Sequence, residues 1–204
     1  MAHRLSYERE TPSQTAGPYV HIGLVPRAAG FEIYDREIGA VIAGPETEGE
    51  RIRIEGVVHD GLGAPVKDVL IEVWQANSHG RYRHPEDQRA LPLEPDFTGF
   101  GRVVPDFGTG LFSFETVKPG PVPGLDGRQQ APHLTLWLVA RGINIGLHTR
   151  LYFEDETEAN AADPILSRIE QPVRRDTLIA RRDGDGYRFD IHLQGDRETV
   201  FLDI

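Results

Sequence analysis

The chain has 204 residues, of which 39% are hydrophobic and 26% are charged, and its formal net charge at pH 7 is -10. This composition is typical of a globular domain, and the acidic balance argues against binding to a nucleic-acid backbone. The absence of cysteine excludes disulfides, thiolate metal sites and a cysteine nucleophile. The N-terminal segment lacks the apolar core of a secretory signal, and no stretch is long enough to span a membrane, so we expect a cytoplasmic protein.

The first 50 residues form a segment of their own. They show no clean hydrophobic periodicity and are interrupted by prolines and glycines such as Pro12, Pro26 and Gly44. We interpret them as an extended arm. An arm of this length stays ordered only when it packs on another surface.

From Arg51 onward the pattern is that of short strands. RIRIEGVVHD places Ile52, Ile54, Gly56 and Val58 on one face. VLIEVWQA follows as a second strand, and the carboxylate of its Glu72 is either edge-facing or a buried, hydrogen-bonded anchor. Further strands are predicted in LFSFETV, LTLWLVARG, TRLYF, GYRFDIHLQG and ETVFLDI.

The connections favour an all-β protein. DGLGAP between the first two strands is interpreted as a hairpin turn, and residues 77–110 as a long, ordered loop. ETEANAADPILSRIE is the one convincing helix, and Pro164 interrupts it. About seven short strands with glycine and proline turns predict a β-sandwich of mixed or antiparallel strands with one short helix.

Spacing alone indicates no catalytic site. The eight histidines form no HxH, HxxxH or HExxH pair, and neither a GxSxG motif nor a phosphate-binding glycine loop is present. Read only in this way, the chain is a β-sandwich of unassigned function.

Three segments in order resemble the intradiol ring-cleavage dioxygenases. They are IEGVVHDGLGAPVKDVLIEVWQANSHGRYRH (54–84), FETVKPGPVPG (114–124) and APHLTLWLVARGINIGLHTRLYFEDE (131–156). ETPSQTAGPYVHIGL (10–24) is similar to one chain type of the two-chain members, which act on 3,4-dihydroxybenzoate. The resemblance covers nearly the whole chain.

The resemblance implies a ferric enzyme whose metal is not in this chain. The family holds one non-haem Fe(III) with two tyrosines and two histidines, and hard phenolates suit that ion. The matching positions here are Tyr82, Val122, His133 and Thr135, so two of the four donors are missing. Gln130 also stands where catalytic chains carry an arginine. We therefore expect no metal ligand and no catalytic residue in this chain.

The resemblance also implies a place for this chain in the active site. A homologous beta subunit with the complete ligand set would hold the iron, while this chain forms one wall of the substrate cavity. The residues carried over to that wall are Thr15, Gly17, Pro18 and Tyr19 of QTAGPYV, together with Arg141 of ARGIN. Gly17 and Pro18 would allow close approach to a flat ligand, and an arginine fork suits the substrate carboxylate.

The expected assembly is a set of alpha-beta heterodimers. In it residues 1–50 pack on the partner subunit and residues 51–204 form the dioxygenase-like domain. The expected reaction converts 3,4-dihydroxybenzoate and O2 to 3-carboxy-cis,cis-muconate. Three alternatives stay open: a purely structural subunit, a transthyretin-like binding module without catalysis, and a homo-oligomeric dioxygenase whose iron site is rebuilt with His79 or His84.

Overall fold

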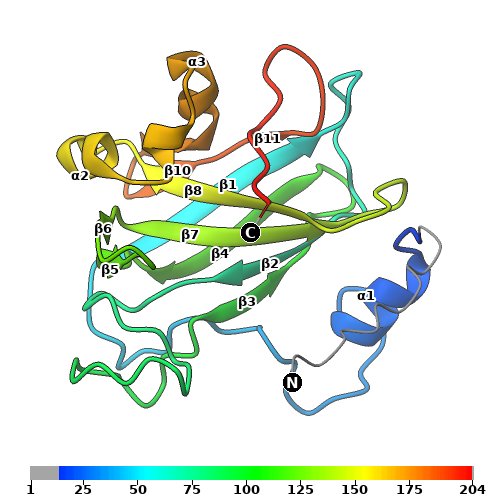
Figure 1. Ribbon diagram of the computed structural model, residues 1–204. Helices are drawn as coiled ribbons and strands as arrows, with labels where there is room; N and C mark the ends of the chain where they lie inside the picture. The colour runs from blue at the N-terminus through cyan, green and yellow to red at the C-terminus, as the bar shows by residue number, and fades with distance from the viewer. Residues whose placement is uncertain (1–13, 204) are drawn as a thin grey trace, which may run out of the picture.

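A computed structural model describes residues 14–203 (Figure 1). The predicted all-β architecture is confirmed, because strands hold more of these residues than the helices do, and the helices are short. The first 13 residues of the predicted arm lie outside the described residues. No helix within residues 14–203 has the length and apolarity that a bilayer crossing requires.

One group of strands forms the layer that positions the sites discussed below. It comprises β2 (Leu70–Trp74), β3 (Phe100–Val103), β7 (His133–Val139) and β8 (Leu147–Phe153), in the order β3-β2-β7-β8. All of these neighbours are antiparallel. Residues that face each other across these strands are therefore fixed by the register of the ladder.

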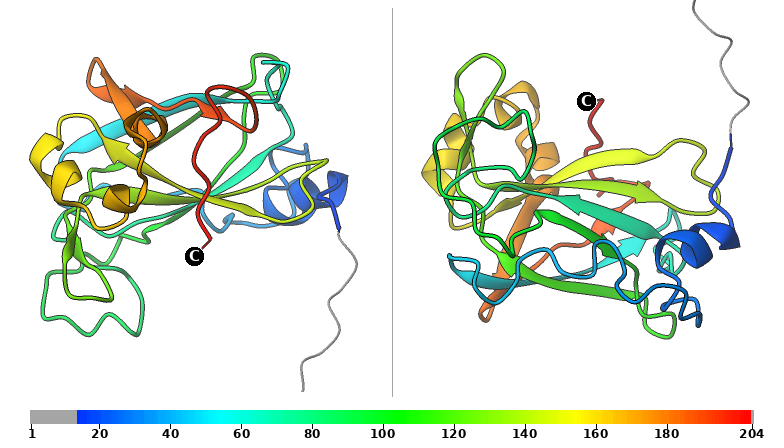
Figure 2. Two further views of the ribbon diagram at one scale, coloured as in Figure 1. Left: turned by 45° about the horizontal axis from the view of Figure 1, so that its top comes forward. Right: turned by 90° about the horizontal axis from the view of Figure 1, so that it is seen from below.

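The second group is centred on β1 (Arg51–His59). It pairs antiparallel with β4 (Leu111–Val117) and parallel with β10 (Gly186–Arg188) and β11 (Ile191–His192). The strand β9 (Ile179–Asp183) pairs with both β8 and β10, so the two groups are joined into one nine-stranded sheet. The right-hand view of Figure 2 shows the two groups as separate layers.

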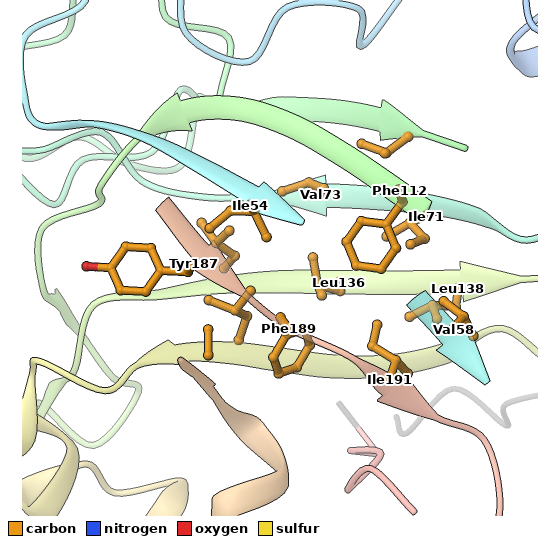
Figure 3. Close-up of a cluster of buried hydrophobic side chains, with 14 of the residues drawn as sticks. Ile54, Val58, Ile71, Val73, Phe112, Leu136, Leu138, Tyr187, Phe189 and Ile191 are labelled. Atoms are coloured by element: carbon orange, nitrogen blue, oxygen red, sulfur yellow. The ribbon is translucent and has the colours of Figure 1, made fainter. Parts of the chain in front are cut away.

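The hydrophobic core fills the space between the layers (Figure 3). The predicted inner face of β1 is confirmed, because every second residue of this strand from Ile52 to Val58 is buried. Leu134, Leu136 and Leu138 of β7 face the same core. Burying a side chain of this size stabilises the fold by roughly 1.5–3 kcal/mol.

Position 56 of β1 requires glycine for a steric reason. A Cβ on Gly56 would lie 1.9 Å from the backbone oxygen of Phe189, so only glycine allows this close approach. The predicted turn that follows β1 closes through a bridge between His59 and Pro65. It does not form a hairpin, because β2 continues into the other layer and pairs with β3 and β7.

The sequence predicted one helix, and the structure contains more helices than that. The predicted segment contains α2 (Thr157–Ala162), which ends before Pro164, and the 3-10 turn η1 (Leu166–Arg168). The structure adds α1 (Pro18–Leu24) and α3 (Pro172–Arg175), the latter followed by the 3-10 turn η2 (Asp176–Leu178). Both added helices begin with proline, whose fixed φ suits the first turn of a helix.

Two strand assignments also differ. The predicted loop 77–110 contains β3, and the predicted last strand ETVFLDI has no strand among its described residues. Thr199 donates one backbone hydrogen bond to the oxygen of His192, but no ladder follows. A separate two-stranded hairpin, β5 (Val122–Pro123) and β6 (Gln129–Gln130), lies in the predicted loop before β7.

Candidate functional site

The residues singled out from the sequence lie in two places at opposite ends of β7. The degenerate metal positions lie at its start, beside the β5–β6 hairpin, and Arg141 follows its end, near α1 (Figure 1). Seven residues of strand separate the two places by roughly 20 Å. We call them the metal-like pocket and the arm cavity.

The arm cavity joins segments that are far apart in the sequence. The Thr15 hydroxyl accepts a hydrogen bond of 2.7 Å from the backbone N–H of Gly142, which is 127 positions away. Gly17, Pro18 and Arg141 line the same cavity, whose volume is about 360 Å³. The structure therefore brings together four of the five residues predicted to form a substrate wall.

Gly17 and Pro18 start helix α1. Gly17 is its N-cap residue and has an extended backbone, while Pro18 is the first helical residue. A Cβ on Gly17 would meet no atom within 4 Å, so the packing of this chain does not require glycine there. Tyr19, the fifth predicted residue, lies outside the cavity lining and is 84% exposed.

The guanidinium group of Arg141 lies at the rim of the arm cavity. Its side chain is 79% exposed, and its Nε lies 3.3 Å from Oδ2 of Asp68. An exposed pair of this kind contributes little stability. The terminal nitrogens of Arg141 therefore stay available to a second carboxylate.

His21 also lines the arm cavity, a position that the sequence did not predict. It is buried, and its Nε2 has no hydrogen-bond partner within the described part of the chain. Burial lowers the pKa of His21, against an opposing effect of Asp68. Its imidazole is therefore a neutral polar group placed against the cavity. No spacing in the sequence marked it.

The metal-like pocket brings the four degenerate positions into one region. Tyr82 and Val122 line a cavity of about 800 Å³. The ring of Tyr82 stacks on Trp74, with centroids 5.9 Å apart, and Trp74 faces Thr135 across the β2–β7 ladder. His133 lies two residues before Thr135 and points to the same side of β7.

The two remaining donors of the metal-like pocket are held in neutral form. His133 is buried, and its Nδ1 lies 2.7 Å from the backbone oxygen of Ala131. Burial, with a smaller effect of the Arg150 charge, lowers the pKa of His133 to about 4. Burial also raises the pKa of Tyr82. At neutral pH these groups offer one imidazole and one protonated phenol.

These donors do not fit a ferric ion. Val122 has no donor atom, and Thr135 offers a hydroxyl that does not ionise near neutral pH. A hard trivalent cation requires several anionic oxygen donors. The guanidinium of Arg150 lies beside the pocket and donates to Oε1 of Gln130 at 2.6 Å. The donors that residues 14–203 present in the metal-like pocket therefore do not fit a ferric ion.

The two histidines considered as replacement ligands lie in different places: His84 lines the same cavity as Tyr82, whereas His79 lies outside that lining. Nε2 of His79 lies 3.2 Å from Glu48 and 3.7 Å from Glu94, so its imidazole pairs with these carboxylates. His84 packs edge-on against Trp74, with centroids 6.4 Å apart.

Asp163 is a second residue that sequence reasoning missed. Its buried carboxylate accepts hydrogen bonds from the backbone N–H groups of Ala131 at 2.8 Å and Leu166 at 2.9 Å, and from the Tyr152 hydroxyl at 3.3 Å. It thereby fixes the segment just before His133. An Asp-Pro pair after a helix was the available sequence signal.

Glu72, the carboxylate noted within the second strand, is held by an ion pair. Nε of Arg102 on the neighbouring strand β3 donates to Oε1 of Glu72 at 2.8 Å. The Glu72 side chain is 24% exposed, so it lies on the outer face of the layer. The position matches neither alternative fully, because β2 lies between β3 and β7 rather than at an edge, and the hydrogen-bonded carboxylate is only half-buried.

Comparison with known proteins places the chain in a family. A family model described as dioxygenase matches residues 33–195. The protocatechuate 3,4-dioxygenase alpha chain of Pseudomonas putida is 54% identical over 198 residues, which cover 95% of this chain and 96% of that protein. The beta chain of the Burkholderia cepacia enzyme is 40% identical over 160 residues, covering 74% of this chain and 67% of that protein.

Solved structures show the same fold. The dioxygenase domain of a carbohydrate-binding fusion protein from Streptomyces sp. SirexAA-E has a TM-score of 0.53 and 22% identity, covering 94% of this chain and all of that one. A 3-chlorocatechol 1,2-dioxygenase from Rhodococcus opacus has a TM-score of 0.56 and 22% identity, covering 76% of this chain and 64% of that one. With the family model and the close relatives, these matches show that the chain belongs to the intradiol ring-cleavage dioxygenase family.

Proposed function

We propose that the chain is the alpha subunit of a protocatechuate 3,4-dioxygenase. In this assignment it pairs with a homologous beta subunit, and the pair cleaves 3,4-dihydroxybenzoate with O2 to 3-carboxy-cis,cis-muconate. The bond between the two hydroxylated ring carbons breaks, and both atoms of O2 enter the two new carboxylates. The similarity to alpha chains over nearly the full length supports the assignment.

The single observation that carries the proposal is the loss of two donors in an otherwise retained pocket. Tyr82 and His133 keep their family positions, whereas Val122 and Thr135 cannot bind a ferric ion. The family generally uses ferric iron, so a partner with the complete donor set must hold it. Bound there, the ion would activate the ring of the catecholate toward O2.

The arm cavity is the part of this chain that we assign to the partner's active site. Helix α1, which lines it, lies at the far end of β7 from the β5–β6 hairpin that borders the metal-like pocket (Figure 1), so its residues cannot act on a ligand held in that pocket. Gly17 and Pro18 would approach the flat ring, and Arg141 would bind the substrate carboxylate. Thr15 would hold the arm and the Arg141 loop together.

Exposed apolar side chains support a partner surface on the arm. Tyr19 is 84% exposed, Ile38 71% and Phe31 47%, although all three are large hydrophobic residues. Such side chains gather where a partner covers them. We therefore assign residues 14–50, with the remainder of the arm, to the contact with the beta subunit. Heterodimers then assemble further.

A chain without cysteine needs no oxidising compartment, which supports a cytoplasmic location.

Reconstitution tests the proposal. This chain and its beta partner are expressed separately and together, and O2 uptake with 3,4-dihydroxybenzoate is measured for each sample. We expect turnover only when both are present, with one iron per heterodimer. Turnover by this chain alone would instead favour a homo-oligomeric enzyme. Turnover by the partner alone, at the rate of the complex, would favour a purely structural subunit.

A further inference from the structure

Arg150 occupies a specific position in the metal-like pocket. It lies on β8 and faces Thr135 across the β7–β8 ladder. Thr135 stands where the family carries its second histidine ligand. Arg150 and Tyr152 are two residues apart on one face of β8, and Tyr152 faces His133 in the same ladder. The arginine therefore belongs to the face that presents the degenerate positions.

The contacts of Arg150 hold its guanidinium on this face. Nη1 donates to Oε1 of Gln130 at 2.6 Å and lies 3.3 Å from the Tyr152 hydroxyl oxygen. Gln130 in turn pairs with Val122 in the β5–β6 hairpin. Nε of Arg150 is buried and has no hydrogen-bond partner in residues 14–203. A cation is thus fixed between the segments of Val122 and Thr135, the two positions that lost their donors.

The charges around Arg150 explain why a cation is retained there. The Tyr152 hydroxyl, which contacts Arg150, donates to Oδ1 of Asp163 at 3.3 Å. Asp163 is fully buried, and a buried carboxylate is stabilised by a nearby positive charge. The other charged groups that line the pocket are Glu86, Asp87 and Arg89, and the last two pair with each other at 2.5 Å. Arg150 is linked to the buried carboxylate of Asp163 through the Tyr152 hydroxyl, so its positive charge lies close enough to stabilise that carboxylate.

We propose that Arg150 replaces the charge of the lost metal ion, so that it stabilises the metal-free pocket and opposes binding of a cation there. The inference rests on the proposed function, because it assumes that iron is held by the partner and not by this chain. It adds a third obstacle to metal binding beyond the missing donors at Val122 and Thr135. Restoring those donors alone should consequently restore only weak iron binding.

The test restores the donors with and without the cation. Val122→Tyr and Thr135→His are combined in the complex with the partner, first with Arg150 kept, then with Arg150→Lys, then with Arg150→Gln. Iron per copy of this chain and tyrosinate-to-iron absorption are measured against the wild type. We expect about one added iron per copy with Arg150→Gln. With arginine or lysine we expect at least about tenfold weaker iron binding.

Two results would overturn the proposal. One is equal iron binding with arginine, lysine and glutamine at position 150, and the other is no iron binding in any of the three. A crystal structure of the wild-type complex provides a test that needs no variant to fold: it should show the Arg150 guanidinium against Gln130 and Tyr152. A side chain turned to solvent would reject the inference. Iron bound between Tyr82 and His133 of the wild type would instead reject the proposed function.

Discussion

The Thr15 hydroxyl accepts a hydrogen bond from the Gly142 backbone N–H at 2.7 Å, which fixes the start of helix α1 against the loop that carries Arg141. One segment comes from the N-terminal arm and the other follows the central strand β7. The arm supplies most of the lining of the arm cavity, and Asp68, Phe107 and Arg141 complete it. The contact between the arm and the Arg141 loop helps to give the cavity its shape, and three predictions follow from it.

Thr15→Val should weaken this junction without disturbing the core. The variant keeps the shape of threonine but loses the acceptor, and a hydrogen bond of this kind contributes about 1 kcal/mol. In the assembled enzyme we expect KM for 3,4-dihydroxybenzoate to rise by about threefold, with little change in kcat. Thr15→Ser retains the hydroxyl and serves as the matched control. An equal effect of both substitutions would argue against the hydrogen bond.

Gly17→Val should harm substrate binding more than stability. The extended backbone of Gly17 accepts a side chain, and a Cβ there meets no atom of this chain within 4 Å. Added bulk would enter the space that we assign to the flat substrate. We expect KM to rise by about tenfold and the melting temperature to fall only slightly, because valine is less favourable than glycine at an N-cap position. Gly23→Ala is the control, because Gly23 lies in the same helix with equally open surroundings.

If the control lowers activity as much as Gly17→Val, the effect belongs to helix α1 as a whole and not to the cavity. If neither variant changes KM, the residues at the start of α1 do not contact the substrate.

Arg141→Ala should raise KM for 3,4-dihydroxybenzoate by about tenfold, because a hydrogen-bonded charge pair with the substrate carboxylate is lost. Asp68→Asn tests the same contact in the opposite direction. It removes the anion that lies 3.3 Å from Nε of Arg141, so KM should fall. Steady-state kinetics with catechol, which lacks the carboxylate, provide the control. A similar loss of affinity for both substrates would show that Arg141 has only a structural role.

The buried imidazole of His133 predicts that the free energy of unfolding depends on pH. Burial lowers its folded-state pKa from 6.5 to about 4, so the free energy of unfolding is highest above pH 6.5 and decreases as the pH falls toward 4. Over this range the loss amounts to about 3 kcal/mol.

Urea denaturation of the wild type and of His133→Asn at several pH values measures this effect. The contributions of the other histidines to the free energy of unfolding cancel when the two proteins are subtracted. We expect the stability of the wild type to fall more steeply than that of the variant between pH 6.5 and 4. Parallel curves would show that His133 is accessible to protons in the folded state.

Most of the strands could be predicted because their side chains alternate within one segment. β1, β4, β7 and β8 all carry this local pattern. ETVFLDI alternates in the same way, yet its backbone makes only isolated hydrogen bonds, from Thr199 to His192 and from Leu202 to His148, and forms no ladder. Helix α1 was hidden because Pro18 resembles an interruption, although proline is favoured at the first helical position.

Some residues of the candidate sites could be predicted from the sequence, and others could not. Val122 and Thr135 could be identified from motifs, because each occupies a fixed place within a recognisable segment. The roles of Arg150 and Asp163 could not, since they depend on the register of β7 against β8 and on a buried carboxylate that joins three segments. Contacts between distant segments leave no periodic signal in the sequence.

The central claim is that this chain completes a dioxygenase whose iron lies in the partner subunit. Anomalous diffraction from crystals of the alpha-beta complex, recorded at the iron absorption edge, tests it directly. We predict one strong iron peak per heterodimer, located in the beta subunit, and none between Tyr82 and His133 of this chain. A peak of comparable height between those two residues would contradict the account.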